Sequence, residues 1–583
     1  MEERLANYEL ISDSSALDSV AKALRGAEAV GVDLETTALS PRDGRIRLLQ
    51  LAIPDQTFVV DVFETGDLSP LKGVLEDGPV KTLHNSKFDF SFLKAEHGIS
   101  LSPIFDTMLA AQLLAGGDQT PSFSLEAVAE RYASVELDKS TRLEDWSGEL
   151  SEAQIEYAAR DASVLLPLRE RLEEDLGEEK LGAVSKIEFR AVAAIAEMEL
   201  AGVKLDVARW KDLETVVRRR RDEKAIELEA QFPQPEGILP LEGLGPRLNL
   251  NSPKQITDAF RTLGVDLQDT KVWTLLKVDH PAARLLLEYR ELQKKLGTYL
   301  ETYPKFVDPG TGRIHANFLQ CRVPTGRLAC TNPNIQQIPN EDEFRSCFVA
   351  EQGNTLVIAD YSQVELRILA EVSDDPAFVR AFQEGEDLHR VTAASMFGVT
   401  LDEVTKDQRS AAKRINFGLM YGRGAKSLSA QLGTDDERAR ALIDEYFANY
   451  PKVQRFLQRT ASRAMRDGTL RTLAGRVRKF GDTSGLLDTR DKGAMRREAM
   501  NYPIQGSSAD IAKLALAYVR EDLEGLDARL INSIHDEFVV ECAEGIAPEV
   551  AERMKEAMNR AGAAILKKVP TEVEVAISPE WRK

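Results

Sequence analysis

The sequence predicts a multidomain protein that combines an α/β domain with an α+β domain. Three observations lead to this prediction. The chain has 583 residues, which is too long for one hydrophobic core. Strand-like runs are followed by helical stretches within about the first 180 residues. After a long helical region, the C-terminal part returns to strands around a further helical insert.

The first domain, over residues 1–182, is expected to contain a mixed sheet with helices. Residues 29–63 hold three apolar, β-branched runs, AVGVDLE, IRLLQLAI and TFVVDVF, which Pro, Arg, Asp and Gly separate. Helical stretches and a fourth run, VKTLHN, follow. This order of elements is typical of the α/β class.

Residues 183–300 are predicted to be mainly helical. The clearest helical patterns are EFRAVAAIAEMELAGV and HPAARLLLEYRELQKKLGTYLETY. Between them, QFPQPEGILPLEGLGPRLNLNSP is rich in Pro and Gly and is expected to form a loop. The final part contains the strand TLVIAD and the pair LINSI and FVVEC, around a helical insert over 381–504.

The composition indicates a soluble globular protein, with 43% hydrophobic and 29% charged residues. The N-terminus, MEERLANYEL, lacks an apolar signal region, and no run of about 18 apolar residues occurs. We therefore expect a cytoplasmic protein without a membrane span. The four cysteines show no C-x-x-C spacing, which indicates buried reduced thiols rather than a zinc site.

The net charge of −20 argues against a simple basic protein that coats DNA, although the local field decides nucleic-acid binding. Between Arg463 and Arg497, ten Arg or Lys residues stand against four Asp. A second basic run is RRRR at 218–221. Charge runs are usually solvated helix faces. Both runs are therefore left open between a surface role and DNA binding.

A group of acidic residues in the first domain predicts a metal site. Asp33 and Glu35 end the first strand two residues apart, so their side chains lie on the same face. Neighbouring acids repel each other, and a hard divalent cation such as Mg²⁺ or Mn²⁺ compensates that repulsion. Asp89 follows in HNSKFDF, and Tyr157 and Asp161 lie one helical turn apart in YAARDAS.

In this order, these residues resemble the three exonuclease motifs of the DEDD superfamily, in the subgroup with tyrosine, whose fold is similar to ribonuclease H. The resemblance implies that Asp33, Glu35, Asp89 and Asp161 hold two divalent ions. It also implies that Tyr157 orients the attacking water, which two metals can activate. His84 and Asn85 are left open between positioning the DNA strand and a structural role.

Two further acidic positions have ordinary interpretations. Asp360 ends the run TLVIAD directly before a helix, where a helix N-cap is the default. His535, Asp536 and Glu537 interrupt LINSI and FVVEC, where a tight turn is the simplest explanation. The stretch RSAAKRINFGLMYG changes both interpretations.

That stretch repeats functional groups every four residues, which keeps them on one side of a helix. The groups are Arg409, Lys413, Phe417 and Tyr421. As a buried packing face this combination makes poor sense, because cations seldom share an apolar stripe with aromatic rings. Cations can instead bind a triphosphate while the rings contact a base and sugar, so the pattern predicts a nucleotide site.

DYSQVELR, RSAAKRINFGLMYG and SIHDEF resemble motifs A, B and C of family A DNA polymerases, the DNA polymerase I type. TGRLACTNPNIQQIP, EGEDLHRVTA, REAMNYPIQGSSADI, LNLNSPKQI and LEYRELQKKLGTY also look like stretches of that family. The resemblance covers essentially the whole chain and implies a Klenow-like enzyme.

The same resemblance implies a domain plan, with the exonuclease at 1–182 and a right-handed polymerase at 183–583. Within the polymerase we expect the thumb over 183–320, the palm over 321–380 and 505–583, and the fingers over 381–504. No segment precedes the exonuclease, so we expect the 5′ nuclease domain to be absent. That absence suggests a phage, organelle or specialised replicative enzyme.

Roles in the polymerase site also follow from the resemblance. Asp360 and Asp536 are expected to bind two Mg²⁺ ions, for which Mn²⁺ can substitute, while Glu537 supports the site. Lys413 is the expected proton donor to the leaving group. The nucleotide contacts are Gln363, Glu365, His389, Arg409, Lys413, Phe417 and Tyr421. The minor-groove contacts are Arg327, Arg497, Asn501 and Gln505, which can check base-pair geometry without reading sequence.

The predicted function is DNA synthesis on primer-template DNA from dNTPs, with 3′-5′ proofreading, by a monomer that acts in replication or repair. By resemblance, Glu365 selects deoxynucleotides and Phe417 disfavours dideoxynucleotides. One alternative is a DEDD exonuclease whose C-terminal part only binds nucleic acid, and the pair Asp360 and Asp536 speaks against it. The other is a single-subunit RNA polymerase of related fold, against which Glu365 argues.

Overall fold

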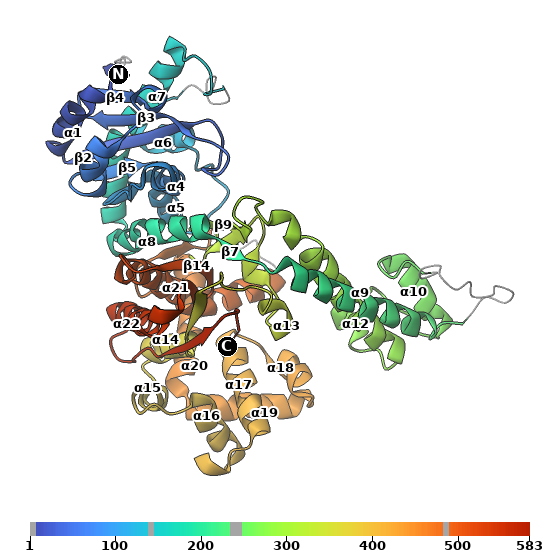
Figure 1. The fold of residues 1–583 in the computed structure, drawn as a ribbon. Coiled ribbons are helices and arrows are strands. Elements are labelled where there is room, and N and C mark those ends of the chain that lie inside the picture. Colours follow the sequence, from blue (N-terminus) through green and yellow to red (C-terminus); the bar gives the residue numbers. More distant parts are fainter. Residues whose placement is uncertain (1–6, 138–144, 234–247, 482–488, 583) are drawn as a thin grey trace. The chain divides into compact units, whose positions relative to one another are not determined.

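The computed structural model of the protein describes residues 7–137, 145–233, 248–481 and 489–582 (Figure 1). Its contacts divide the chain into two compact units. The larger unit comprises Met1–Ala201, Asn317–Cys330 and Val357–Ile577, and the smaller one Gly202–Ala316, Thr331–Leu356 and Ser578–Lys583. Most of the loop predicted between the two helical patterns, and residues 482–488 of the basic segment, lie outside the described residues.

A six-stranded mixed sheet forms the N-terminal core, with strand order β1-β4-β3-β2-β5-β6. Its strands are β1 (Tyr8–Ile11), β2 (Ala29–Thr36), β3 (Ile46–Ile53), β4 (Gln56–Asp61), β5 (Val80–Leu83) and β6 (Ile104–Asp106). Since β2 runs antiparallel to β3 and parallel to β5, the predicted mixed sheet is confirmed. β1 and β6 were not predicted, because edge strands of four and three residues are too short to show a period.

Helix α7 packs against β2 and β3 of this sheet. It begins with a capping box in which Ser151 and Gln154 satisfy each other's backbone amides. The helices of this part are α1 (Leu17–Arg25), α2 (Val62–Thr65), α3 (Ser69–Glu76), α4 (Ser86–His97), α5 (Thr107–Leu114), α6 (Leu125–Ala133), α7 (Glu152–Glu178) and α8 (Gly182–Ala201). The run TFVVDVF leaves the sheet early because Asp61 caps α2.

A second, four-stranded sheet has the order β14-β15-β11-β16. Its strands are β11 (Asn354–Tyr361), β14 (Ala528–Ile534), β15 (Glu537–Ala543) and β16 (Val573–Ser578). β14 and β15 form the predicted antiparallel hairpin. Helix α21 (Thr489–Asp522) packs against α22 (Ala547–Ile565) and α14 (Val364–Ser373).

The predicted helical insert is present. It contains α15 (Pro376–Gln383), α16 (Leu388–Phe397), α17 (Lys406–Met420), α18 (Ala425–Leu432), α19 (Asp436–Asn449), α20 (Pro451–Asp467), β12 (Thr469–Arg471) and β13 (Val477–Lys479). Helix α21 runs through the proposed boundary between fingers and palm, although it contains Pro503. The Ser507 hydroxyl donates to the Pro503 carbonyl oxygen at 2.6 Å within this helix. The domain boundaries stay a prediction.

The smaller unit is mainly helical. Its elements include β7 (Val203–Lys204), α9 (Val207–Glu229), α10 (Pro253–Thr262), α11 (Val272–Leu275), α12 (Pro281–Lys294), β8 (Arg313–Ile314) and α13 (Asp342–Arg345). The four arginines at 218–221 lie on α9, and each has a carboxylate within 4 Å. Their partners are Glu214 and Glu301 for Arg218, Glu223 for Arg219, Glu343 for Arg220 and Asp222 for Arg221. This pairing favours the surface-helix interpretation of the run.

Within the described residues, no helix combines the length and the hydropathy that crossing a membrane requires. The four cysteines, Cys321, Cys330, Cys347 and Cys542, are buried free thiols.

Candidate active sites

A cavity of about 500 Å³ lies beside β11, the β14–β15 turn and helices α14, α16 and α17. We call it the palm cavity, after the domain predicted for these residues. It brings together most of the residues predicted for the polymerase site. Those that line it are Arg327, Asp360, Gln363, Glu365, His389, Arg409, Lys413, Phe417, Tyr421 and Asp536.

Asp536 is presented to the palm cavity by a tight turn. β14 ends at Ile534 and β15 begins at Glu537, so His535 and Asp536 form the whole turn. His535 has a φ of 58°, in the left-handed region. The turn interpretation and the acidic-site interpretation of this stretch are therefore compatible. Burial, and then the charge of Asp360, raise the pKa of Asp536 to about 7.

Asp360 is not a helix N-cap, which corrects the default interpretation. β11 continues to Tyr361, and Gln363 occupies the N-cap position of α14. The Tyr361 backbone amide donates to the Asp536 carbonyl oxygen at 3.3 Å, which joins β11 to the turn. Because the strand extends past Asp360, its carboxylate is left to line the palm cavity. Glu537, the first residue of β15, is buried.

The four-residue repeat predicted for 409–421 lies along α17. Arg409, Lys413 and Phe417 are on the helix, and Tyr421 is its C-cap. The two cationic side chains are exposed and the two rings are half-buried. The rings of Phe417 and Tyr421 are stacked, with centroids 6.4 Å apart. One end of the helix face is thus cationic and the other aromatic.

His389 is buried, and one of its ring nitrogens contacts the first of a series of hydrogen-bonded polar side chains. Asn416 Nδ2 lies 3.0 Å from His389 Nδ1. Asn416 also contacts Thr392, whose hydroxyl oxygen lies 3.1 Å from that of Tyr450. An amide donor at Nδ1 places the ring proton on Nε2. Burial lowers the pKa of His389 to about 4, so the ring is neutral near pH 7.

Asp387 hydrogen-bonds to both His389 and Arg409, two residues predicted to bind the nucleotide phosphates. It is the N-cap of α16 and accepts a hydrogen bond from the His389 backbone amide at 2.9 Å. It also accepts one from Arg409 Nε at 2.5 Å. A single carboxylate therefore fixes Arg409 and the start of the helix that carries His389.

Glu365 is held between two partners beside the palm cavity. Arg327 Nη2 donates to Glu365 Oε1 at 2.6 Å, and the Tyr421 hydroxyl donates to Glu365 Oε2. Burial, and then the charge of Glu365, raise the pKa of Tyr421, so its hydroxyl stays protonated. These contacts fix the Glu365 side chain in one orientation.

The remaining predicted DNA contacts lie on one side of α21. Arg497, Asn501 and Gln505 recur every four residues on this helix. Arg497 is exposed, and the other two are half-buried. Gln505 hydrogen-bonds to the Tyr421 hydroxyl. Asn501 Oδ1 is buried with no hydrogen-bond partner among the described residues.

A second cavity, of about 530 Å³, holds the five residues predicted for the exonuclease site. We call it the exonuclease cavity, after the activity predicted for these residues. Asp33 and Glu35 come from β2, Asp89 from α4, and Tyr157 and Asp161 from α7. Strand and helix approach closely here, because β2 carries Gly31. An added Cβ on Gly31 would lie 2.3 Å from the Ala162 carbonyl oxygen. Glycine therefore allows Asp33 and Asp161 to come together.

The acids of the exonuclease cavity repel one another. Burial, and then the charge of Asp161, raise the pKa of Asp33 well above its usual value. Burial, and then Asp33, do the same to the pKa of Asp89. The Tyr157 hydroxyl hydrogen-bonds to Asp161, and burial and that charge raise the pKa of Tyr157. Ionisation of these carboxyl groups is therefore costly, and a bound cation would stabilise their charged forms.

His84 and Asn85 lie at the turn before α4. The two ring nitrogens of His84 contact Thr107 Oγ1 and the Phe123 carbonyl oxygen, each at 2.9 Å. Asn85 has a φ of 63° and shapes the turn that leads into the helix of Asp89. These contacts favour the structural interpretation of His84.

The donor types in both cavities fit a hard divalent cation. Carboxylate oxygens are the ligands that Mg²⁺ prefers. In the described parts of the chain, no group of three or more His, Cys, Asp or Glu side chains is already arranged to hold a metal ion. Burial, and then a neighbouring carboxylate, raise the pKa of both Asp536 and Asp33, so a bound cation would stabilise their ionised forms.

Comparison with known families gives two matches. The family described as DNA polymerase family A matches residues 235–583, which is more than half of the chain. The chain belongs to DNA polymerase family A. The family described as 3′-5′ exonuclease matches residues 8–177. The predicted order of an exonuclease followed by a polymerase is therefore confirmed.

Relatives of this family A polymerase include several bacterial proteins. The chain is 34% identical to DNA polymerase I of Aquifex aeolicus, over 99% of this chain and 100% of that protein. It is also 34% identical to DNA polymerase I of Pseudomonas aeruginosa, over 99% of this chain but 66% of the relative. The thermostable DNA polymerase I of Thermus aquaticus is 37% identical over 85% of this chain and 57% of its own length.

A solved structure supports the fold over nearly all of the chain. It is described as the POL domain of Pol1 from M. smegmatis in complex with DNA primer-template and dNTP. It matches with a TM-score of 0.83 at 29% identity and covers 98% of this chain and 99% of that one. The predicted fold class is confirmed.

Two residues of the candidate polymerase site, Asn416 and Asp387, were not predicted from the sequence of this family A polymerase. Asn416 precedes Phe417 inside α17, where asparagine is an unfavourable helix residue and therefore signals a specific contact. Asp387 precedes a helix, where an N-cap role conceals its second contact with Arg409.

Proposed function

We propose that this family A polymerase extends a primer in the palm cavity and removes mispaired 3′ ends in the exonuclease cavity. One observation carries the proposal: Asp360 and Asp536 share the palm cavity with the cationic end of α17. Phosphoryl transfer needs acids that hold cations and positive groups that hold the phosphates. The complex of the M. smegmatis protein with primer-template and dNTP supports the same substrates here.

The incoming dNTP is bound along α17. Arg409 and Lys413 are exposed on the cavity side and contact the phosphates. His389 donates its Nε2–H, because Asn416 occupies Nδ1. Lys413 also gives a proton to the departing pyrophosphate. Phe417 and Tyr421 contact the sugar and the base of the new pair.

Asp360 and Asp536 would hold two Mg²⁺ ions in the palm cavity, supported by Glu537, and Mn²⁺ is expected to substitute. Asp33, Glu35, Asp89 and Asp161 would hold a second pair in the exonuclease cavity. When bound, such ions lower the pKa of the attacking hydroxyl or water and stabilise the leaving oxygen.

Selection of deoxynucleotides rests on Glu365. Its carboxylate is fixed by Arg327 and Tyr421, so it cannot move aside readily for a ribose 2′-hydroxyl. Gln363, at the N-cap of α14, lines the same cavity. Its Oε1 is buried with no hydrogen-bond partner among the described residues and can accept one from the substrate.

The primer-template is gripped from its minor groove by Arg327, Arg497, Asn501 and Gln505. Acceptors in that groove lie at similar positions in every correct pair, so these side chains check geometry rather than sequence. The basic segment 463–497 leads into them, and its exposed cations, among them Lys492 and Arg496, contact the DNA backbone. Binding is therefore expected to weaken with rising salt, despite the acidic total charge.

Digestion takes place in the exonuclease cavity. The Tyr157 hydroxyl is protonated and held by Asp161, so it can orient the attacking water. The four carboxylates around it match the need for paired cations on both sides of the phosphate.

The direct test is a primer assay with purified protein, Mg²⁺ and four dNTPs, on one matched and one mismatched primer. We expect extension of the matched primer, and removal of the mismatched end before extension. Absence of extension with digestion retained would leave only the nuclease function.

Phe417→Tyr is expected to raise dideoxynucleotide incorporation relative to dNTP by roughly tenfold, the value of one hydrogen bond of about 1.4 kcal/mol. The new hydroxyl supplies a hydrogen bond where a dideoxy sugar lacks its own. Single-turnover incorporation with each nucleotide measures the ratio. Phe447→Tyr, on α19, is the control, since Phe447 packs on Tyr446. An unchanged ratio in Phe417→Tyr would remove Phe417 from the sugar contact.

Asn416→Leu is expected to raise the KM for dNTP by roughly tenfold with a smaller change in kcat, because His389 loses the group that fixes its tautomer. Steady-state kinetics in the His389→Ala background provide the control. There Asn416→Leu should add little, since its partner is already gone. Independent effects of the two substitutions would show that Asn416 does not act through His389.

A further inference from the structure

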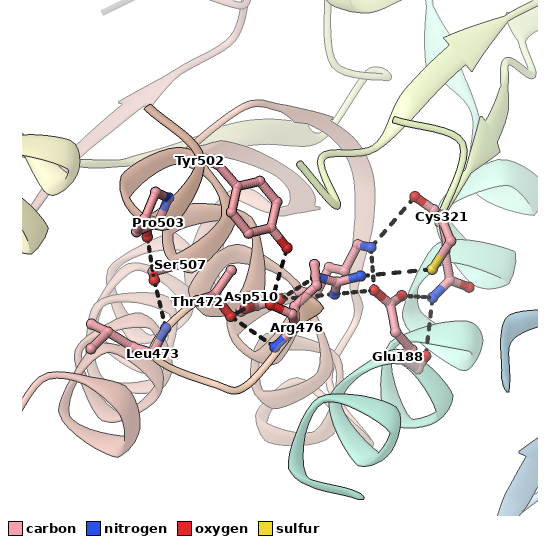
Figure 2. Close-up of polar contacts among 11 residues, drawn as sticks. Glu188, Cys321, Thr472, Leu473, Arg476, Tyr502, Pro503, Ser507 and Asp510 are labelled. Carbon is pink, nitrogen blue, oxygen red and sulfur yellow. Dashed lines mark hydrogen bonds and ion pairs between the residues drawn. The ribbon is translucent and has the colours of Figure 1, made fainter. Parts of the chain in front are cut away.

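A cluster of buried charges lies beside α21 (Figure 2). Its members do not line either cavity. It consists of Glu188, Arg476, Asp510 and Lys513, and each of these residues is at most 4% exposed. We call these four residues the charge cluster. Buried charges are costly even when they are paired. No step of the proposed reaction uses these four residues, so a structural or positioning role is expected for them.

Arg476 is the centre of the charge cluster. Its Nε donates to Asp510 Oδ1 at 2.8 Å, and its Nη2 donates to Glu188 Oε1 (Figure 2). Lys513 Nζ donates to the same Glu188 oxygen at 2.6 Å. Burial alone would raise the pKa of Glu188, but Lys513 and Arg476 lower it to about 2. Glu188 is therefore charged at every pH at which the protein is expected to work.

The charge cluster joins three elements. Glu188 lies on α8, Arg476 precedes β13, and Asp510 and Lys513 lie on α21. Two hydrogen bonds donated by hydroxyl groups strengthen the connection between the β12–β13 hairpin and α21. The Thr472 hydroxyl donates to Asp510 Oδ2 at 2.6 Å, and the Tyr502 hydroxyl donates to the Arg476 carbonyl oxygen at 3.0 Å.

Arg476 lies directly against the turn that presents Arg327. Gly326 has a φ of 79°, and an added Cβ would lie 2.5 Å from Arg476 Nε. A similar contact occurs beside Gln505, because a Cβ on Gly506 would lie 2.5 Å from Thr472 Cγ2. Two of the proposed minor-groove contacts thus adjoin glycines that pack against the hairpin.

The segment that leads to Arg327 is also tied to Glu188. Gln320 Nε2 donates to Glu188 Oε2 at 2.8 Å and to the Glu188 carbonyl oxygen at 3.0 Å. Lys513 Nζ lies 3.5 Å from the Gln320 carbonyl oxygen. The position of this segment therefore depends on the charge cluster at both Gln320 and Gly326.

The start of the same segment, at Asn317 and Phe318, contacts Lys87 in the exonuclease part of the chain. Lys87 Nζ donates to Asn317 Oδ1 and to the Phe318 carbonyl oxygen, each at 2.7 Å. Lys87 lies on α4, two residues before Asp89 of the exonuclease cavity. Residues 317–327 thus connect the helix of one cavity with a side chain of the other.

We propose that the charge cluster positions the side chains of Arg327 and Gln505, which contact the minor groove at the primer end. It holds Arg327 and Gln505 at the spacing that fits the minor groove of a correct terminal pair, and so favours extension of paired over mispaired ends. The proposal rests on the minor-groove role given to Arg327 under the proposed function. A mispair displaces the groove acceptors, and only rigidly held donors lose their contacts when this happens. Arg476 is a positioning residue, since it acts through the turn of Arg327.

The test removes the guanidinium with Arg476→Met, in a chain whose digestion is disabled by Asp33→Ala and Glu35→Ala. Single-nucleotide incorporation is measured on matched and mismatched primer ends. We expect extension of the matched end to fall roughly ten- to a hundredfold, as for a misplaced positioning group. Extension of the mismatched end should fall much less. In the chain with intact exonuclease residues, digestion of single-stranded DNA should be unchanged by Arg476→Met.

Arg190→Met is the matched control. Arg190 lies on α8, two residues after Glu188, and its guanidinium binds Glu521 on α21 with distances of 2.6 and 2.5 Å. This pair joins the same two helices but is exposed. If the effect of Arg476 depends on its buried contact with Gly326, the Arg190→Met variant should extend matched and mismatched primer ends at the rates of the parent chain without this substitution.

A double-mutant cycle with Arg327→Ala decides the outcome. If Arg476 acts through Arg327, Arg476→Met should change little once Arg327 is gone. Additive effects, or equal losses on both primer ends and in digestion, would overturn the inference. If Arg327→Ala alone has no effect, the minor-groove role of Arg327 fails and the inference fails with it. Should Arg476→Met not fold, Arg476→Lys takes its place in the same cycle.

Discussion

Replacing Asp536 with alanine is expected to slow primer extension by roughly a thousandfold or more, while digestion stays near its original rate. Each tenfold in rate corresponds to about 1.4 kcal/mol, and loss of bound-metal stabilisation is worth several kcal/mol. Asp536 is one of the paired acids in the palm cavity, and its turn contacts β11 directly. The exonuclease cavity is lined by other residues. Extension with four dNTPs and digestion of a labelled single strand measure the two activities.

The control for this substitution is Asp527→Ala. Asp527 is an exposed aspartate directly before β14, the strand that leads into the turn of Asp536. Its removal deletes a carboxyl group near the same hairpin, and Asp527 does not line the palm cavity. Normal extension by Asp536→Ala, or equal loss of extension by Asp527→Ala, would contradict the assigned role.

Replacing Asp33 and Glu35 together with alanine should have the opposite effect. Digestion of a 3′ end is expected to fall by roughly a thousandfold or more, because two of the four carboxylates that hold the cations are lost. Extension of a matched primer should remain within about twofold, since the palm cavity keeps all its residues. The variant should then leave in place a mismatched primer end that the parent protein removes.

Asp55→Ala serves as the control for the exonuclease substitutions. Asp55 is an exposed aspartate between β3 and β4 of the same sheet. It should leave both activities unchanged. If the double substitution abolished extension as well as digestion, the two cavities would not be separate sites.

The length of an element decided how well the fold could be predicted. β2, β3 and β11 each have eight residues and a nearly continuous apolar run, so the sequence shows them clearly. β6 has three residues, and β4 ends early because Asp61 caps a helix. The unbroken course of α21 through Pro503 was also hidden, because proline normally ends a helix.

The residues of the candidate sites were predicted from motifs, and the two cavities gather most of them. The prediction that Asp360 is a helix N-cap was wrong, because the pairing of β11 with neighbouring strands extends the strand past that residue. A local sequence pattern does not show this pairing. Contacts between distant residues were not predictable. Arg476 and Glu188 are far apart in sequence, and no period or motif links a buried cation with its partner. The contact of Asn416 with His389 depends in the same way on how α17 packs against α16.

The most direct measurement is a crystal structure of the protein with primer-template, an unreactive dNTP analogue and Mn²⁺, in which anomalous scattering locates the ions. We expect a pair of ions between Asp360 and Asp536 that also contacts the nucleotide phosphates. Bound nucleotide with no ion bridging these two carboxylates would contradict the two-metal site on which the proposed function depends.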